Sequence, residues 1–104
     1  MVNDNEIKKI TEYENILNKE KELIENLNKA IDEYTEYEKH YQKLKNYYNS
    51  KEYFDDLDKD QKGMYPEELP RGIFSEDAIF DLFGEKQNLG FKMAEEGIKT
   101  LRNY

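Results

Sequence analysis

The residues whose types and spacing come nearest to a chemical site are aspartates in the middle of the chain. Asp56, Asp58 and Asp60 alternate, and Glu67 stands at the twelfth position counted from Asp56. This is the ligand spacing of an EF-hand calcium loop, in which carboxylate oxygens surround the cation. The sixth position of such a loop is a glycine that makes a sharp turn, but here it is Gln61. We therefore favour a solvated acidic helix face, with calcium as a weak alternative, and expect no cofactor.

The single histidine and the remaining carboxylates provide little evidence for catalysis. His40 follows Glu36 at a helical spacing that can hold a metal ion, but two ligands without a third are poor evidence for a site. Paired carboxylates act as general acid and base only in a sheltered pocket that shifts one pKa, and the sequence indicates no such pocket. An enzyme, most concretely a metal-dependent or carboxylate-based hydrolase, is the least favoured class.

Arg71 is one of only two arginines and lies in a turn rich in proline, glycine and acidic residues. A guanidinium binds a carboxylate in a bidentate manner that lysine cannot reproduce, so our first interpretation is that Arg71 ties this turn to a carboxylate. The alternative is that Arg71 contacts a partner protein. The candidate partner-binding residues are Arg71, Asp55, Asp56, Asp58, Asp60, Glu76 and Asp77.

The charge balance restricts the class of partner. The chain carries a net charge of -8, and residues 51–77 hold nine acidic against four basic side chains. Direct binding to nucleic acid is disfavoured because phosphate neutralisation needs a basic face. We expect a protein partner, which would be basic if it docks on the acidic segment.

The expected location is the cytoplasm. The chain has no cysteine, which is typical of a reducing compartment and excludes disulfides and thiol nucleophiles. Its first residues lack the apolar region of a secretory signal, and no later run reaches membrane-spanning length.

Apolar residues at helical spacing run through the first half of the chain. Neither glycine nor proline occurs between Glu6 and Tyr48, and apolar residues recur there at steps of three and four. One continuous helix would extend about 65 Å at 1.5 Å per residue, so it either bends back as a hairpin or pairs with another chain. The one candidate break is the capping-box pattern from Thr35 to Glu38. Pairing with a second copy would use Ile10, Leu17, Ile24 and Ile31.

The second half has clearer helix start and stop signals. Ser50 is expected to cap a helix from Lys51 to about Gln61, which Gly63 terminates. A turn-rich connector follows, in which Gly72 can take positive φ. We expect the last helix to begin after Ser75, with its hydroxyl as the cap. Within that helix Gly84, Gly90 and Gly97 indicate fraying, a break near Gly84, or close packing, of which we favour close packing.

Residues 44–93 resemble a known family. The pattern consists of Tyr47-Tyr48-x-Ser50-x-x-Tyr53, Asp55, an acidic run ending at Gly63, Pro66-x-x-Leu69, and Arg71-Gly72-Ile73-Phe74-Ser75-Glu76-Asp77. It is similar to the small bacterial proteins grouped as domain of unknown function 4298. The resemblance implies a compact α-helical protein. It implies no particular activity, because the family has none assigned.

The sequence thus predicts an all-α fold: a small helical bundle that forms one domain over residues 1–104. Residues 1–49 would form a long helix or hairpin, and residues 50–104 a short acidic helix, a Pro/Gly turn and a C-terminal helix. The expected core residues are Leu44, Tyr48, Phe54, Leu57, Leu69, Ile73, Phe74, Ile79, Leu82 and Phe83.

Three functions remain open, in order of preference. The first is a non-enzymatic protein-interaction module. The second is an acidic inhibitor or immunity protein that mimics nucleic acid and blocks a basic site on a toxin or nuclease. The third is the hydrolase.

Overall fold

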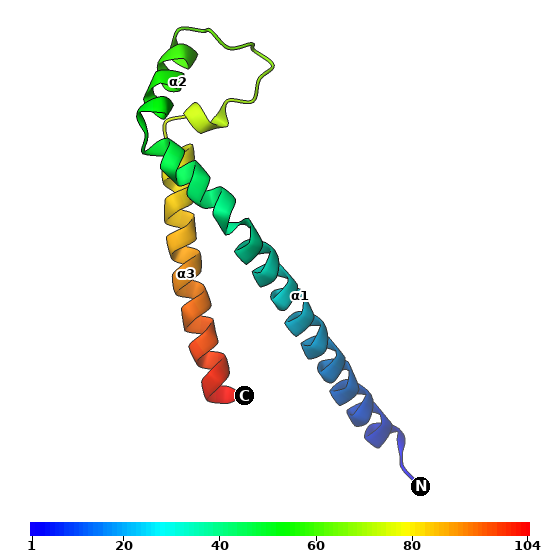
Figure 1. Cartoon of the computed structure of the whole chain (residues 1–104). Helices are drawn as coiled ribbons and strands as arrows, with labels where there is room; N and C mark the ends of the chain where they lie inside the picture. The colour runs from blue at the N-terminus through cyan, green and yellow to red at the C-terminus, as the bar shows by residue number, and fades with distance from the viewer. The chain divides into compact units, whose positions relative to one another are not determined.

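The computed structural model describes all of residues 1–104 and consists of three α-helices and one short 3-10 helix. Along the chain these are α1 (Asp4–Tyr48), α2 (Lys51–Gln61), η1 (Gly72–Phe74) and α3 (Ala78–Asn103), as Figure 1 shows. The predicted all-α fold is confirmed. The chain divides into an N-terminal unit, Met1–Lys45, and a C-terminal unit, Asn46–Tyr104. The single domain over residues 1–104 stays a prediction, and each unit is described below by itself.

Helix α1 is one continuous helix of 45 residues. Asn3 caps its start, since the Asn3 Oδ1 accepts a hydrogen bond from the Glu6 amide at 2.9 Å. The capping-box residues from Thr35 to Glu38 lie inside the helix and do not interrupt it. Of the two sequence alternatives, the continuous helix is therefore the one found, because no glycine or proline is present to reverse the chain.

Helix α2 begins and ends as predicted. The Ser50 hydroxyl accepts a hydrogen bond from the Tyr53 amide at 3.3 Å and donates one to the Tyr47 carbonyl at 2.6 Å. At the other end Gly63 has a φ of 70°, its amide donates to the Asp60 carbonyl, and the Met64 amide donates to the Lys59 carbonyl. These two bonds form a Schellman motif, which requires a left-handed residue and so favours glycine.

The start of α3 differs from the prediction. The Ser75 amide donates to the Gly72 carbonyl and closes η1, which leaves Ser75 extended at φ −66° and ψ 148°. Helix α3 begins only at Ala78, and Asp77 holds the N-cap position without a side-chain capping bond. The prediction that Ser75 caps α3 was wrong, because the helix starts three residues later and Ser75 does not stand at its N-cap position. Gly72 is the first residue of η1 and has no positive φ.

Helix α3 continues through Gly84, Gly90 and Gly97 without a break. A methyl group added at any of the three would meet no atom within 4 Å. The close packing that we favoured at these glycines is therefore absent from the structure.

The C-terminal unit is held together by aromatic side chains around Tyr53. Tyr53 and Ile79 are its two buried residues, exposing 6% and 4% of their surface. Among the other expected core residues, Leu44, Tyr48, Leu57, Phe74, Leu82 and Phe83 are half-buried. The prediction was wrong for three residues that are exposed, namely Phe54, Leu69 and Ile73. Phe54 turns outward because neighbours on a helix point about 100° apart, so burying Tyr53 directs Phe54 away.

The glycines allow a test of this packing. Because Gly90 and Gly97 lie inside a helix with open space around them, Gly90→Ala and Gly97→Ala should each raise the free energy of unfolding by about 0.5–1 kcal/mol. Gly63→Ala is the control with the opposite expectation. It should lower the free energy of unfolding by about 1 kcal/mol, since alanine is strained at a positive φ. Urea unfolding followed by circular dichroism measures all three. Destabilisation by Gly90→Ala would show that another backbone approaches α3 there.

Candidate functional site

The aspartates of α2 do not form one cluster. Successive residues of a helix rotate by about 100°, so Asp56 and Asp60 share one face while Asp58 lies on the opposite side. The Asp56 carboxylate is half-buried and accepts a hydrogen bond from the Tyr47 hydroxyl at 2.6 Å. Asp58 is exposed and its Oδ2 lies 2.8 Å from the Lys62 Nζ. The side chains are thus distributed by helix geometry to separate partners.

Most of the residues that have the calcium-loop spacing lie in a helix. Residues 56–61 belong to α2, whereas an EF-hand needs them in a loop that wraps around the cation. Glu67 lies in the connector after α2 and is exposed. In the structure no group of three or more histidine, cysteine, aspartate or glutamate side chains is arranged to hold a metal ion. The aspartates lie on a helix as we expected, but they do not form one solvated face, because Asp56 and Asp60 are half-buried and bonded to Tyr47 and Arg71.

Arg71 ties the connector to α2. Its Nη1 donates to the Asp60 Oδ1 at 2.9 Å, and the two side chains expose 32% and 20% of their surface. The sequence indicated a carboxylate partner for Arg71, and the structure identifies it as Asp60, eleven residues earlier. Glu76 and Asp77 lie beyond η1 and are exposed, as is Asp55 on α2. Of the seven candidate residues, four therefore make contacts within the C-terminal unit, namely Arg71, Asp56, Asp58 and Asp60.

Tyr53 and Tyr47 make packing and hydrogen-bond contacts within the C-terminal unit that the sequence did not predict. The Tyr53 ring lies 5.4 Å from the Tyr47 ring and 5.0 Å from the Tyr48 ring, and its hydroxyl donates to the Ile73 carbonyl at 3.1 Å. Burial, and then the bond to Asp56, raises the pKa of Tyr47 well above its ordinary value. Burial also raises the pKa of Tyr53. The sequence signal for these roles was the dense run of aromatic residues from 47 to 54.

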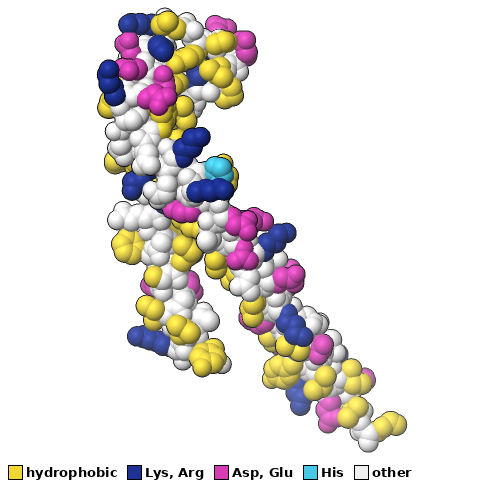
Figure 2. All heavy atoms as spheres, in the orientation of Figure 1, with side chains coloured by type: hydrophobic (Ala, Val, Ile, Leu, Met, Phe, Trp, Pro, Cys, Tyr) yellow, Lys and Arg dark blue, Asp and Glu magenta, His cyan; other side chains and the backbone are white.

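A different surface runs along α1, where no residue is buried. In the N-terminal unit we define an apolar stripe of eight side chains that fall within about 140° of the helix circumference. It consists of Ile10, Tyr13, Ile16, Leu17, Leu23, Ile24, Leu27 and Ile31. Each of them exposes 42–63% of its surface, and Figure 2 shows hydrophobic side chains along this part of the helix.

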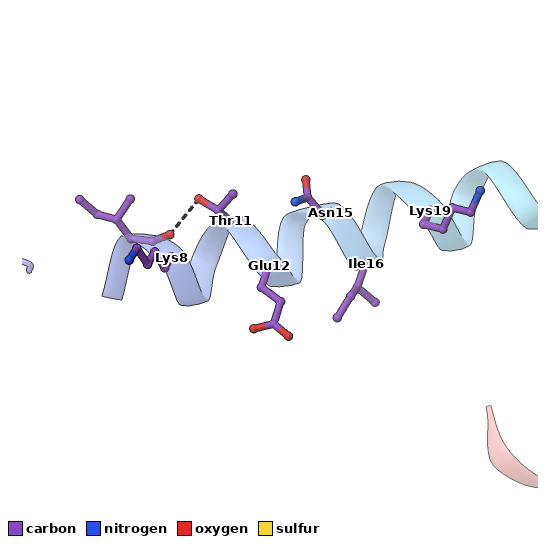
Figure 3. Close-up of a pocket in the computed structure, with 7 residues that line it drawn as sticks. Lys8, Thr11, Glu12, Asn15, Ile16 and Lys19 are labelled. Atoms are coloured by element: carbon purple, nitrogen blue, oxygen red, sulfur yellow. Dashed lines mark hydrogen bonds between the residues drawn. The ribbon is translucent and has the colours of Figure 1, made fainter. Parts of the chain in front are cut away.

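A hollow of about 510 Å³ also lies on α1 (Figure 3). Its lining residues are Ile7, Lys8, Thr11, Glu12, Asn15, Ile16 and Lys19. All seven come from a single helix, so no second element closes the hollow against water. The Thr11 hydroxyl within it donates to the Ile7 carbonyl at 2.8 Å. A surface so open to solvent lacks the sheltered environment that shifts a catalytic pKa.

None of the helices combines the length and apolar character needed to cross a lipid bilayer.

Comparison with known proteins identifies one family. A family model described as Domain of unknown function (DUF4298) matches residues 10–96. The match therefore extends beyond the C-terminal motifs and includes the apolar stripe of α1. No curated protein and no solved structure matches the chain.

The contact between Arg71 and Asp60 can be tested by exchanging the charges. Arg71→Glu should lower the free energy of unfolding by about 1 kcal/mol or more, because it places two carboxylates together in a half-buried position. Adding Asp60→Arg to that variant should restore most of the loss, and Asp55→Arg, at an exposed aspartate of the same helix, should not. Urea unfolding of the single and double variants gives the coupling energy. Equal stability with and without Asp60→Arg would contradict the contact.

The raised pKa of Tyr47 predicts how stability changes at alkaline pH. The folded chain holds this proton more tightly than the unfolded chain, whose tyrosines ionise near pH 10. The contribution is therefore complete below about pH 10 and is lost as the pH rises through the folded pKa. Tyr47→Phe should lower stability at neutral pH and make its alkaline decline shallower. Tyr104→Phe, at a fully exposed tyrosine outside the stripe, is the control, and an unchanged decline in Tyr47→Phe would contradict the assignment.

Proposed function

The chain belongs to the family described as Domain of unknown function (DUF4298), and from this premise we propose that it is a non-enzymatic protein-interaction module. Its binding surface is the apolar stripe of α1. The observation that supports the proposal is the exposure of that stripe along a helix of 45 residues with no buried side chain. Soluble proteins rarely expose large contiguous apolar patches unless another molecule covers them.

The partner that fits this surface is another helix with an apolar face. Residues spaced three and four apart along one side of a helix are the anchors by which helices pack into grooves or onto one another. Charged side chains such as Lys21 and Glu25 flank the stripe and would remain at the rim of such an interface. Apart from Glu20, which lies on the same side of the helix, the core of the contact is apolar, and the charges at its edges select partners.

An acidic inhibitor is the second candidate. It is favoured by the exposed carboxylates of residues 51–77, which include Asp55, Glu76 and Asp77. It is weakened by the use of Asp56 and Asp60 inside the C-terminal unit, since a nucleic-acid mimic needs its charges directed outward. The hydrolase ranks third because the hollow on α1 is open to water.

The proposal is tested by affinity capture from the cells that naturally make the chain. Ile24→Glu should lose the partner, because it places a carboxylate in the middle of the stripe. Asn15→Glu is the matched control, since it adds the same charge on the opposite side of the same helix, and it should retain the partner. Helical content by circular dichroism verifies that both variants fold.

Charge reversal separates the second candidate from the first. If the captured partner survives Ile24→Glu but is lost when the exposed Asp55, Glu76 and Asp77 are changed to lysine, the interaction uses the acidic segment. That result would favour the inhibitor and contradict the proposed role of the stripe.

A further inference from the structure

We infer that the occupant of the apolar stripe is a second copy of this chain, and that the two α1 helices pair antiparallel about a two-fold axis near Glu22. This inference deepens the proposed function and rests on it, because it identifies the helix that the stripe binds. The stripe itself, the position of one charged residue within it, and the area that it exposes support the inference.

The spacing of the stripe suits self-pairing. Its central positions are 13, 17, 20, 24, 27 and 31, which follow one another at alternating steps of four and three, as in the two inward positions of a coiled-coil heptad. The steps read the same in both directions. An antiparallel copy can therefore present the same series, with Tyr13 opposite Ile31 and Leu17 opposite Leu27. An interface of this kind is isologous and closes on itself as a dimer.

Glu20 decides between the two orientations. It occupies one of the central positions of the stripe, between Leu17 and Ile24 on the same side of the helix. In a parallel, in-register pair the two Glu20 carboxylates would face each other in the contact, where like charges are removed from water at a high cost. In the antiparallel pair Glu20 lies opposite Ile24 of the second copy and beside Lys21, which precedes Ile24 by one turn. Each carboxylate then has a cation from the other copy.

The side positions support the same orientation. Ile16 and Leu23 widen the stripe along one edge and expose 50% and 42% of their surface. In an antiparallel pair corresponding edges of the two helices face each other, so the Leu23 side chains meet near the two-fold axis. In a parallel pair this edge faces the opposite edge of the other helix, which carries Glu14 and Lys21 instead. The apolar edge is covered only in the antiparallel arrangement.

The exposed area is sufficient for a dimer. Each of the eight side chains exposes on the order of 90 Å², so covering all of them would bury roughly 700 Å² per copy. A standard specific interface buries about 800 Å² per partner, which is similar. The length is sufficient as well, because residues 10–31 of one helix extend about 32 Å. A homodimer is therefore expected.

Sedimentation equilibrium over a range of concentrations tests the self-association. The natural chain should form dimers at tens of micromolar, and Ile24→Glu should weaken the dimer at least tenfold. Asn15→Glu should leave the dissociation constant within about twofold. A chain that stays monomeric at the highest concentration would overturn this inference.

Cross-linking tests the orientation, and it is clean because the natural chain has no cysteine. Tyr13→Cys and Ile31→Cys chains carrying tags of different size are mixed and oxidised. An antiparallel dimer brings residue 13 of one copy within disulfide distance of residue 31 of the other, so the mixed product should dominate. Dominant linking of each variant to itself would show a parallel pair and overturn the orientation.

The two levels of the proposal fail in different ways. A monomeric chain whose captured partner still disappears in Ile24→Glu would overturn the second copy as the occupant and keep the interaction module. A monomeric chain whose capture is unaffected by Ile24→Glu would overturn both.

Discussion

The burial of Tyr53 is the interaction on which the C-terminal unit depends. Its ring lies against Tyr47 and Tyr48 at the end of α1 and against Phe74 of η1, while its hydroxyl donates to the Ile73 carbonyl. One side chain therefore links α2 both to the end of α1 and to η1, whose Ile73 lies 20 residues further along the chain. In so small a core an aromatic ring supplies much of the available apolar area, and the hydroxyl satisfies a carbonyl that η1 leaves without an internal partner.

The polar contacts around this ring explain why the acidic segment is only partly available for binding. Asp56 is held by Tyr47 and Asp60 by Arg71, so these carboxylates attach the end of α1 and the connector to α2. Charge-assisted bonds in half-buried positions are stronger than those in full solvent exposure. The residues that looked most like a ligand cluster are therefore structural, and the two proposed interactions rest on the exposed carboxylates and on the stripe of α1.

Helix α1 of the N-terminal unit has no buried core residue comparable to Tyr53. None of its residues is buried, and the apolar stripe remains exposed. Most helical stability in proteins comes from packing an apolar face, not from intrinsic propensity, so a long helix with an uncovered stripe gains stability when another helix binds it. Binding of the proposed partner helix would therefore also stabilise α1. The family match, which includes residues 10–44, indicates that this helix belongs to the family architecture.

Local signals in the sequence determined the helices, and tertiary packing decided which side chains do what. Ser50 and Gly63 act through hydrogen bonds to residues a few positions away, so α2 could be predicted. The continuous helix could be predicted as well, because α1 contains no glycine or proline that would interrupt it. The cap of α3 could not be predicted in this way, because α3 begins only at Ala78 and Asp77, not Ser75, stands at its N-cap position. The pairing of Arg71 with Asp60, the burial of Tyr53 and the exposure of Phe54 depend on how the connector folds back on α2. Glu67, Glu68, Glu76 and Asp77 all lie nearer to Arg71 in sequence than Asp60 does, so only the three-dimensional path of the chain selects Asp60.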